Sequence, residues 1–582
     1  MQLLSDGGVM LLEHWRSVLV LTATMLGLGT WGVSLLPGIA KHRLWITFPL
    51  GLGTGAILLT LLSFILFIAS LVYRDVLQPG AYGILAAGSI FLVLGIRRRE
   101  TLLATVWGVP VLLLLLLVRL AFVNQLVLPP YSDSPTHYLV VLNLLEPSSR
   151  PEALYSLESI FQHYYHFGVH CLTAWLALAS GETSPLLLAV VGQVFLAVLP
   201  FSVFALAGIL TANSPPGVRN SAAWMAGLIA AFGFWMPAFG VNWGKYPTVA
   251  ALAVTPIPLA YLYAAKGAEP RSSSWIATAL LSAGVFLLHS RSGLLLALAL
   301  ASDVFVRLVY PRLSRVHRGP IWAGIVLAAA LVYWGWVRPD LVGYYISNWP
   351  LLVAIAVLVP SAVAAYPKEG LAAILAFAGI AALSMLGTAS FLPGRTFFEV
   401  LDRPFVQMGL YMPLAVLGGL GAAGSAAQLS GTRRLSALPV VLLCLLILLA
   451  AASIRTFCPN QCCDYVSKDD LRAFEWLNKN ASSDALIVTA GLQGSTRILE
   501  QDAGTWVYAI TGRSTTKRSF NSSLYDPGFV ASICRNRKEV YLYVGGRDMS
   551  FELSEILADK KDYTAVFHSG STLLARVKSC PQ

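Results

Sequence analysis

Long blocks of uninterrupted apolar residues constrain this chain more than any other feature. Residues 111–118 and 440–452 are apolar on every face of a helix, as a helix surrounded by lipid must be. Such blocks recur from near the N-terminus to about residue 455, so a removable signal peptide does not account for them. Only 12% of the 582 residues are charged, about half the share typical of soluble domains. The sequence therefore predicts a polytopic α-helical membrane protein.

The apolar blocks predict about fourteen transmembrane helices, each near the length that a tilted helix needs to cross a bilayer. The expected spans are 15–38, 44–72, 81–96, 102–122, 185–210, 220–237, 247–265, 275–289, 293–310, 320–337, 350–366, 370–388, 405–428 and 436–454. Together they make up a multi-pass transmembrane domain over residues 1–455.

Basic residues gather in alternate short loops, and this predicts which side of the cell membrane each loop faces. The basic loops are 41–43, 97–99, 219, 266–271, 312–318, 368 and 433–434. Placing them in the cytoplasm puts the N-terminus and the tail outside the cytoplasm. It also requires that 164–180 be a juxtamembrane or re-entrant segment of one large outer loop, 123–184. The formal charge of +11 then reflects orientation, and we expect no nucleic-acid partner.

The tail, residues 456–582, changes character and predicts a small extracytoplasmic α/β domain. Residues 469–480 are typical of an amphipathic helix, and strands are expected at 485–489, 505–510, 539–545, 563–567 and 572–577. Five of the seven cysteines lie here, at 458, 462, 463, 534 and 580, which favours one or two disulfides in an oxidising compartment. A zinc site is the alternative for the CPNQCC run, but it has neither a nearby His nor a CxxC pair.

The large outer loop begins with the pair Asp133 and His137, which would share one face of a helix. A carboxylate there could be a general base or a metal ligand. Alternatively, Asp133 caps the N-terminus of a helix whose first turn contains Pro135. The two roles are compatible.

Three histidines further along the same loop, His163, His166 and His170, have helical spacing. Three imidazoles on one face could bind a metal, so a divalent cation is a possible cofactor. The alternative is a set of hydrogen-bonded groups at headgroup depth.

Three more outer loops combine a cation with aromatic residues and helix breakers. They contribute Lys245 with Tyr246, His289 with Arg291, and Arg395 with Arg403. On this side the cations cannot serve the positive-inside bias, so they indicate an anionic ligand, for which a phosphate suits Arg. Snorkelling to lipid headgroups is the alternative for each one singly.

The sequence lacks the motifs of several classes of membrane protein. There is no GxxxxGK[ST] motif for ATP and no Gly-rich dinucleotide loop. Few ionisable residues fall within the spans, and they include Arg119, Asp303 and Arg307, the last two spaced to pair along a helix. This scarcity disfavours ion-coupled transport.

Taken together, these features resemble the GT-C superfamily of membrane glycosyltransferases. The resemblance rests on Asp133 followed by His137, on the Tyr-Tyr-His-Phe-Gly segment at 164–168, on Met236-Pro237 leading into 242–247, and on an AxxWLxxN helix at 473–480. A Trp-Trp-Asp-Tyr-Gly motif is absent, which argues against the oligosaccharyltransferase branch. The second acidic residue that often accompanies the loop Asp is also absent.

The resemblance implies transfer of a sugar, with inversion, from a polyprenyl-phosphate or -diphosphate carrier to an acceptor on the outer face. It implies that Asp133 accepts or orients the acceptor's proton, with Glu158 as an alternative carboxylate, and that Lys245, Arg291 and Arg395 stabilise the departing lipid phosphate. Partners would be the lipid-linked donor, membrane lipids and a lipid, glycan or protein acceptor. A lipid-linked saccharide ligase, polymerase or transporter, or a non-catalytic envelope-assembly protein, remains the alternative.

Overall fold

A computed structural model describes residues 2–34, 44–146, 165–266, 272–313, 339–386, 402–429, 454–493, 498–535, 537–547, 549–559, 561–578 and 580. The chain divides into two compact units. The helical unit comprises Met1–Asn124, Leu157–Val241 and Tyr246–Cys458, and the sheet unit comprises Gln125–Ser156, Asn242–Lys245 and Pro459–Gln582. The sheet unit is therefore larger than the expected tail domain, because it takes in part of the large outer loop and four residues of a second outer loop.

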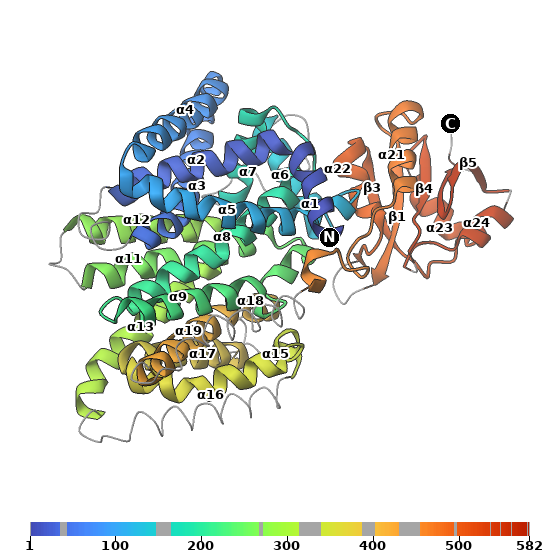
Figure 1. Ribbon diagram of the computed structural model, residues 1–582. Coiled ribbons are helices and arrows are strands. Elements are labelled where there is room, and N and C mark those ends of the chain that lie inside the picture. Colours follow the sequence, from blue (N-terminus) through green and yellow to red (C-terminus); the bar gives the residue numbers. More distant parts are fainter. Residues whose placement is uncertain are drawn as a thin grey trace. The chain divides into compact units, whose positions relative to one another are not determined.

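The helical unit consists of apolar helices that continue through short 3₁₀ and π turns (Figure 1). Its first half contains α1 (Gln2–Glu13), α2 (Trp15–Ser34), α3 (Leu44–Ser70), η2 (Arg74–Val76), α4 (Leu77–Ile96), α5 (Arg99–Leu120), η3 (Val123–Gln125, ending in the sheet unit), α7 (Gly168–Ser180), α8 (Leu187–Leu210), α9 (Pro216–Leu228) and η5 (Ile229–Gly233). Its second half contains η6 (Ala238–Trp243, also shared), α10 (Tyr246–Val254), α11 (Pro256–Lys266), α12 (Ser272–Leu288), α13 (Ser290–Leu313), α15 (Pro339–Ile346), α16 (Trp349–Ala365), α17 (Pro367–Leu386), α18 (Arg403–Gly409), α19 (Tyr411–Leu429) and η9 (Ile454–Phe457).

Within the described ranges, nine helices are long and apolar enough to cross a membrane. This confirms a multi-pass helical membrane protein, while the expected span at 320–337, and that at 436–454 up to residue 453, lie outside the described residues. Helix α8 is buried from Leu187 to Ile209 and packs against α3, α5, α9, α10 and α11. A helix that is apolar on all faces thus forms the centre of the unit.

Two expected spans are interrupted rather than continuous. The span at 220–237 passes from α9 into the π-helical turn η5 and ends at the extended residue Phe234. The span at 247–265 is divided at Thr255 into α10 and α11, because Pro256 cannot donate the next helical hydrogen bond. In sequence, the two interruptions flank Asn242–Lys245, the short segment that belongs to the sheet unit.

Helix α7 matches the segment that was expected not to cross the membrane. Its 13 residues extend over about 20 Å, less than the ~30 Å hydrocarbon core. Every residue from Gly168 to Ala177 is buried, and the helix packs against α2, α3 and α4. That the segment is juxtamembrane or re-entrant, and does not cross the membrane, stays a prediction.

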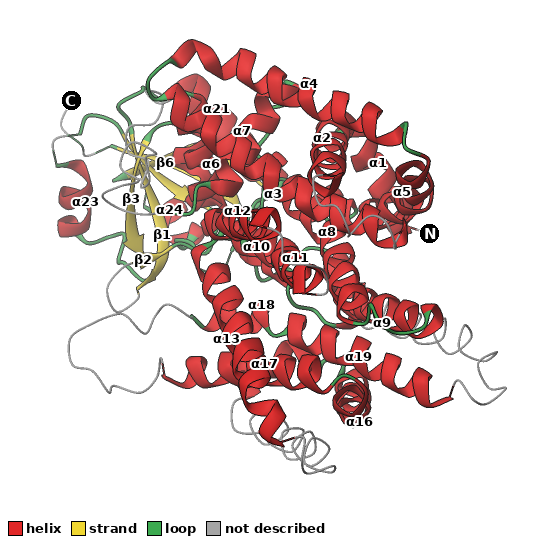
Figure 2. Ribbon diagram, turned by 90° about the vertical axis from the view of Figure 1, so that its left-hand side faces the viewer, coloured by secondary structure: helices red, strands yellow, loops and turns green. Residues whose placement is uncertain are grey.

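The sheet unit is a mixed sheet with helices on both faces, as Figure 2 shows. Its elements are α6 (Asp133–Leu145), α21 (Lys468–Asn480), β1 (Leu486–Gln493), β2 (Ile498–Leu499), η10 (Ala503–Trp506), α22 (Val507–Thr511), β3 (Ser514–Ser519), α23 (Pro527–Cys534), β4 (Val540–Val544), α24 (Leu553–Ala558), β5 (Tyr563–Ser569) and β6 (Thr572–Val577). The strand order is β2-β1-β4-β6-β5, and β3 also pairs with β1. Strands β3 and β4 run parallel to β1, whereas β4, β6 and β5 are antiparallel neighbours.

Alternation along the strands gives the sheet two apolar faces and therefore two cores. One core joins Val488 and Leu542 to α23 and α24. The other joins Ile487 and Tyr541 to α21 and α22, and also receives Tyr138 and Leu139 from α6. Helix α6, which carries Asp133, is thus packed into the sheet unit by the same core that holds α21.

Helix α21 is tied to the sheet by one buried carboxylate. Ser467 and Asp470 form a capping box at its start, which satisfies two backbone N–H groups. The Oδ1 atom of Asp470 also accepts hydrogen bonds from Tyr543 at 2.5 Å and Thr572 at 2.7 Å. The amphipathic helix expected at 469–480 is confirmed.

One expected strand is wrong, and the cysteine prediction is sharpened. Residues 505–510 belong to η10 and α22, because so short an apolar run cannot be assigned to strand or helix from hydrophobicity alone. The α22 helix ends at Gly512, whose φ of 71° favours glycine. Disulfides join Cys534 to Cys580 and Cys462 to Cys463.

Candidate functional site

Asp133 stands at the first position of α6, where its side chain is 38% exposed. The residue that caps the helix is Ser132, and its side chain makes no capping hydrogen bond. The expectation that Asp133 caps the helix is therefore wrong, and the carboxylate is directed elsewhere. Its Oδ2 atom accepts from the Nζ atom of Lys245 at 2.5 Å. Two expected site residues, 112 positions apart in sequence, are thus joined within the sheet unit.

Two unusual backbone conformations bring these residues together. Tyr131, two residues before Asp133, has a φ of 68°, which is uncommon for a side chain of this size. Gly244 has a φ of 63°, and a Cβ atom there would lie 2.7 Å from the Oγ atom of Ser134. Gly244 therefore lies directly on the first turn of α6, where only glycine fits, and places Lys245 next to Asp133.

The turn after Pro459 bonds to both segments that carry the ion pair. The backbone N–H of Asn460 donates to Oδ1 of the buried Asn242 at 2.7 Å. On the other side, the N–H of Tyr131 donates to the carbonyl oxygen of Cys463 at 2.7 Å. The side chain of Asn460 closes the turn by accepting from the N–H of Cys462 at 3.0 Å. The tail thereby fixes the relative positions of Asp133 and Lys245.

Aromatic and charged groups of the tail lie beside the ion pair. The rings of Tyr131 and Tyr465 are 5.9 Å apart, and the guanidinium of Arg547 lies 5.7 Å from the Tyr465 ring. Burial raises the pKa of Tyr465 to about 12, with further contributions from Tyr131 and Asp133. Burial also raises the pKa of Asp464, which Arg547 opposes. Asp464 therefore adds a second carboxyl group to this neighbourhood, one that no motif indicated.

His137 lies one turn after Asp133 in α6, as expected, but it is only 6% exposed. The catalytic role expected for His137 stays a prediction.

In the helical unit, His289 and Arg291 converge on the start of α18. The Nη1 atom of Arg291 donates to Oδ2 of Asp402 at 2.7 Å, and Oδ1 of Asp402 caps α18 by accepting from the N–H of Phe405. The His289 ring stacks on the Phe405 ring at 5.5 Å. Arg291 is 31% exposed, so it remains accessible to an anion while paired with Asp402.

Two of the three expected loop histidines, His166 and His170, lie in the segment that contacts His289. The His166 ring lies 4.5 Å from His289, and Tyr165 contacts both His166 and His170. Across the described residues, no group of three or more His, Cys, Asp or Glu side chains is arranged to hold a metal ion. His163 lies outside the described residues, so the three-histidine site stays a prediction.

The remaining expected residues are spread over different environments. Tyr246 is fully buried, where its ring packs beside Gly192 of α8, so its contribution is to packing. Arg403 is exposed at the start of α18. Glu158 and Arg395 lie outside the described residues.

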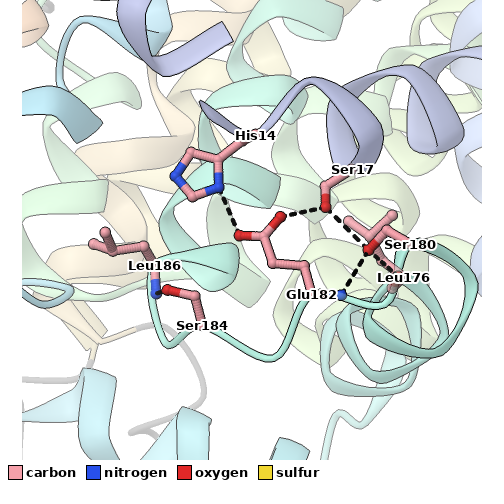
Figure 3. A network of polar contacts seen from close by, with 7 residues as sticks. All are labelled: His14, Ser17, Leu176, Ser180, Glu182, Ser184 and Leu186. Carbon is pink, nitrogen blue, oxygen red and sulfur yellow. Dashed lines mark hydrogen bonds and ion pairs between the residues drawn. The ribbon is translucent and has the colours of Figure 1, made fainter. Parts of the chain in front are cut away.

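A further polar network, which the sequence did not indicate, lies at the start of α2. The Nδ1 atom of His14 is 2.6 Å from Oε1 of Glu182, and Ser17 donates to Oε2 at 2.5 Å (Figure 3). Ser17 also bonds to Ser180 at the end of α7. Despite opposition from burial, the hydrogen bond with Glu182 raises the pKa of His14, and the same contacts lower the pKa of Glu182. The network joins α2 to the loop between α7 and α8.

The expected pairing of Asp303 with Arg307 in α13 is confirmed at 3.0 Å, and Tyr263 adds a hydrogen bond to the same carboxylate. Arg119, at the end of α5, is 3% exposed and donates to the Ala231 carbonyl oxygen and to Thr456. Each of these charged groups thus has a hydrogen-bonded partner within the helical unit.

Chemically, the Asp133–Lys245 pair offers a carboxylate oxygen, Oδ1, that makes no hydrogen bond to the described residues, next to a partly exposed ammonium group. Such a pair could accept a proton and stabilise a developing negative charge. The Arg291–Asp402 pair offers a second accessible cation.

No protein-family model matches this chain, and no curated protein matches it either.

Proposed function

We propose that this protein is a membrane glycosyltransferase of the GT-C type, which moves a sugar from a polyprenyl-phosphate or -diphosphate carrier to an acceptor. The observation that carries the proposal is the ion pair between Asp133 and Lys245, which three separate chain segments position at the start of α6. A carboxylate in the first large outer loop is the feature on which the resemblance depends. The orientation that follows from the basic loops puts this centre outside the cytoplasm.

In the proposed reaction, an acceptor hydroxyl attacks the anomeric carbon of the sugar from the side opposite the lipid phosphate. The bond between the anomeric carbon and the phosphate oxygen breaks, and the configuration inverts. The Oδ1 atom of Asp133 receives the hydroxyl proton, while Oδ2 stays bound to Lys245. The leaving phosphate carries the electron pair of the broken bond.

Cations would stabilise the charge that grows on the phosphate in the transition state. Lys245 is the candidate, because it belongs to the same unit as Asp133 and is bonded to it. A lipid carrier delivers the donor within the bilayer, so the reaction needs no nucleotide-binding fold.

The test is incubation of the purified protein, in lipid nanodiscs, with a panel of isotope-labelled polyprenyl-phosphate sugars and lipid extracts as acceptors. Mass spectrometry would follow the donor and the released polyprenyl phosphate. We expect at least one donor to be consumed with stoichiometric release of the carrier lipid. Consumption of none would contradict the proposal and favour transport or assembly.

A further inference from the structure

A groove of about 510 Å³ opens between α3, α5, α8 and α9 in the helical unit. Its wall is apolar and rich in aromatic rings, and Asn220 provides the polar side chain. Protein interiors are normally packed without voids of this size. An apolar groove within membrane-spanning helices is open to lipid rather than to water, so its natural filling is a hydrocarbon chain.

The groove is a built feature of the packing, because its rings are braced by one another and by small residues. Trp45, Phe204 and Trp224 form a chain of edge-to-face contacts at 5.2 and 5.1 Å. A Cβ atom on Gly108 would lie 2.2 Å from the Phe48 ring, so this glycine lets the ring lie against α5. At the edge, Trp107 is 78% exposed and Trp224 is 46% exposed. The wall is therefore closely packed, and one side is open.

The length of the groove fits one leaflet. Along α5 its lining extends from Leu103 to Leu115, which is about 18 Å at 1.5 Å per residue. The hydrocarbon core of a bilayer is ~30 Å thick, so the groove covers little more than half of it. An acyl chain of a lipid in one leaflet would therefore extend along the whole groove.

The two ends of the groove differ in charge. At the Asn220 end, the guanidinium of Arg219 lies 5.0 Å from the ring centre of Trp45, and its buried Nε atom has no hydrogen-bond partner in the described part of the chain. At the other end, where Ala231 lines the groove, the nearby cation is Arg119, which is buried and already hydrogen-bonded. Of these two arginines, Arg219 is therefore the one with a nitrogen that no described residue bonds, whereas Arg119 is committed to its own partners.

We infer that this groove binds one acyl chain of an anionic phospholipid, with the lipid phosphate held by Arg219 beside Trp45. A guanidinium matches phosphate geometry, and Trp is favoured at headgroup depth. The site is independent of the proposed transfer reaction, because the lipid is bound as a resident component of the membrane part and not consumed.

The test is native mass spectrometry of the full-length protein released from nanodiscs that contain equal amounts of phosphatidylglycerol and phosphatidylcholine with identical acyl chains. We expect one phosphatidylglycerol to be retained in preference to phosphatidylcholine. Arg219→Gln should lower that preference by about fivefold to tenfold. Ala104→Phe, which adds a ring inside the groove, should abolish retention of either lipid.

Arg16→Gln is the matched control, because Arg16 also lies over a tryptophan, Trp15, at 5.5 Å but away from the groove. It should behave as the wild type. The inference is overturned if the wild type retains no lipid, if it retains the two lipids equally, or if Arg16→Gln lowers the preference as much as Arg219→Gln. It is also overturned if added isoprenoid phosphate displaces the phospholipid, since the groove would then belong to an isoprenoid chain. Should Ala104→Phe fail to fold, Arg219→Gln and its control still decide the outcome.

Discussion

The helical unit and the sheet unit use long-range polar contacts between different kinds of chain segment. In the helical unit these contacts lie at the ends of packed apolar helices, as between Arg291 and Asp402 at the starts of α13 and α18. In the sheet unit they join turns and loop segments, such as Asp133 with Lys245 and Asn242 with Asn460. The candidate reaction centre therefore belongs to the unit in which turns, rather than long helices, are held together by polar contacts.

The two units also depend on different sources of stability. Apolar burial and helix packing dominate the helical unit, where whole helices such as α8 are buried. The sheet unit has a small core on each face of its sheet and is reinforced by a disulfide and by α6, a helix from another part of the chain. A change in a covalent link or a buried charge should therefore act on one unit and spare the other.

The largest effect is expected from removing the Cys534–Cys580 disulfide by changing both residues to Ser. The link closes a loop with a sequence separation of 46, and loop-closure entropy gives about 4 kcal/mol of stabilisation. Hydrogen exchange in the full-length protein should show faster opening of β1 and β4, with α3 and α8 unchanged. The matched control, Cys462→Ser with Cys463→Ser, opens a link between adjacent residues and should have a much smaller effect. An equal increase in the hydrogen-exchange rates of α3 and α8 would contradict the claim that the two units are stabilised separately.

A smaller effect of opposite sign is expected from Asp502→Asn in the sheet unit. Burial raises the pKa of Asp502 to about 7, although the N–H of Gly504 donates to its Oδ1 atom. A raised carboxyl pKa contributes stability that is complete below about pH 4 and is lost as the pH rises through 7. At pH 8 the Asn variant should therefore be more stable than the wild type by on the order of 2–4 kcal/mol, with the gain shrinking toward pH 4.

Hydrogen exchange of β1 and β4 at pH 5 and pH 8, corrected for intrinsic rates, would measure this difference. Asp526→Asn is the control, because Asp526 accepts the same kind of bond from Gly528 in an exposed position. No gain for Asp502→Asn at pH 8, or an equal gain for the control, would show that burial of this carboxyl group costs nothing.

The smallest effect is expected from His14→Gln in the helical unit. The pKa of His14 is raised and that of Glu182 is lowered from ordinary values of 6.5 and 4.5. The stabilisation from this ion pair is therefore complete between pH 4.5 and pH 6.5. It is lost at higher pH, as His14 loses its proton, and at lower pH, as Glu182 gains one. His14→Gln should cost about 1–2 kcal/mol at pH 6 and less at pH 8.5, as measured by thermal unfolding. Ser17→Ala, which removes a bond without a titrating group, should cost the same at both pH values; a His14→Gln cost that does not vary with pH would contradict the pairing.

The sequence predicted the parts of this structure that depend on local pattern. Apolar blocks predicted the membrane helices, and the amphipathic repeat predicted α21. The pattern failed at 505–510, since this apolar stretch is too short for its hydrophobic period to separate a helix from a strand. It also gave the tail as a separate domain, because nothing in residues 125–145 shows that α6 shares a core with α21.

The candidate centre was predictable in its members but not in its geometry. Asp133 and Lys245 each stood out as costly polar residues, yet no spacing rule joins positions so far apart. Their meeting depends on Gly244, Tyr131 and the turn at Asn460, which act through backbone conformation and backbone hydrogen bonds. The glycine one residue before Lys245 was a local signal in the sequence for the sharp turn that brings Lys245 to Asp133.

Sugar transfer by Asp133→Asn tests the central claim most directly. The amide keeps the size of the side chain and can still accept a hydrogen bond from Lys245, but it cannot take the acceptor proton. With a donor that the wild type consumes, the rate should fall by about 10²–10⁴-fold, while donor binding and hydrogen exchange of the sheet unit stay unchanged. Full transfer by the folded Asp133→Asn protein would contradict the assignment of this carboxylate as the reacting base.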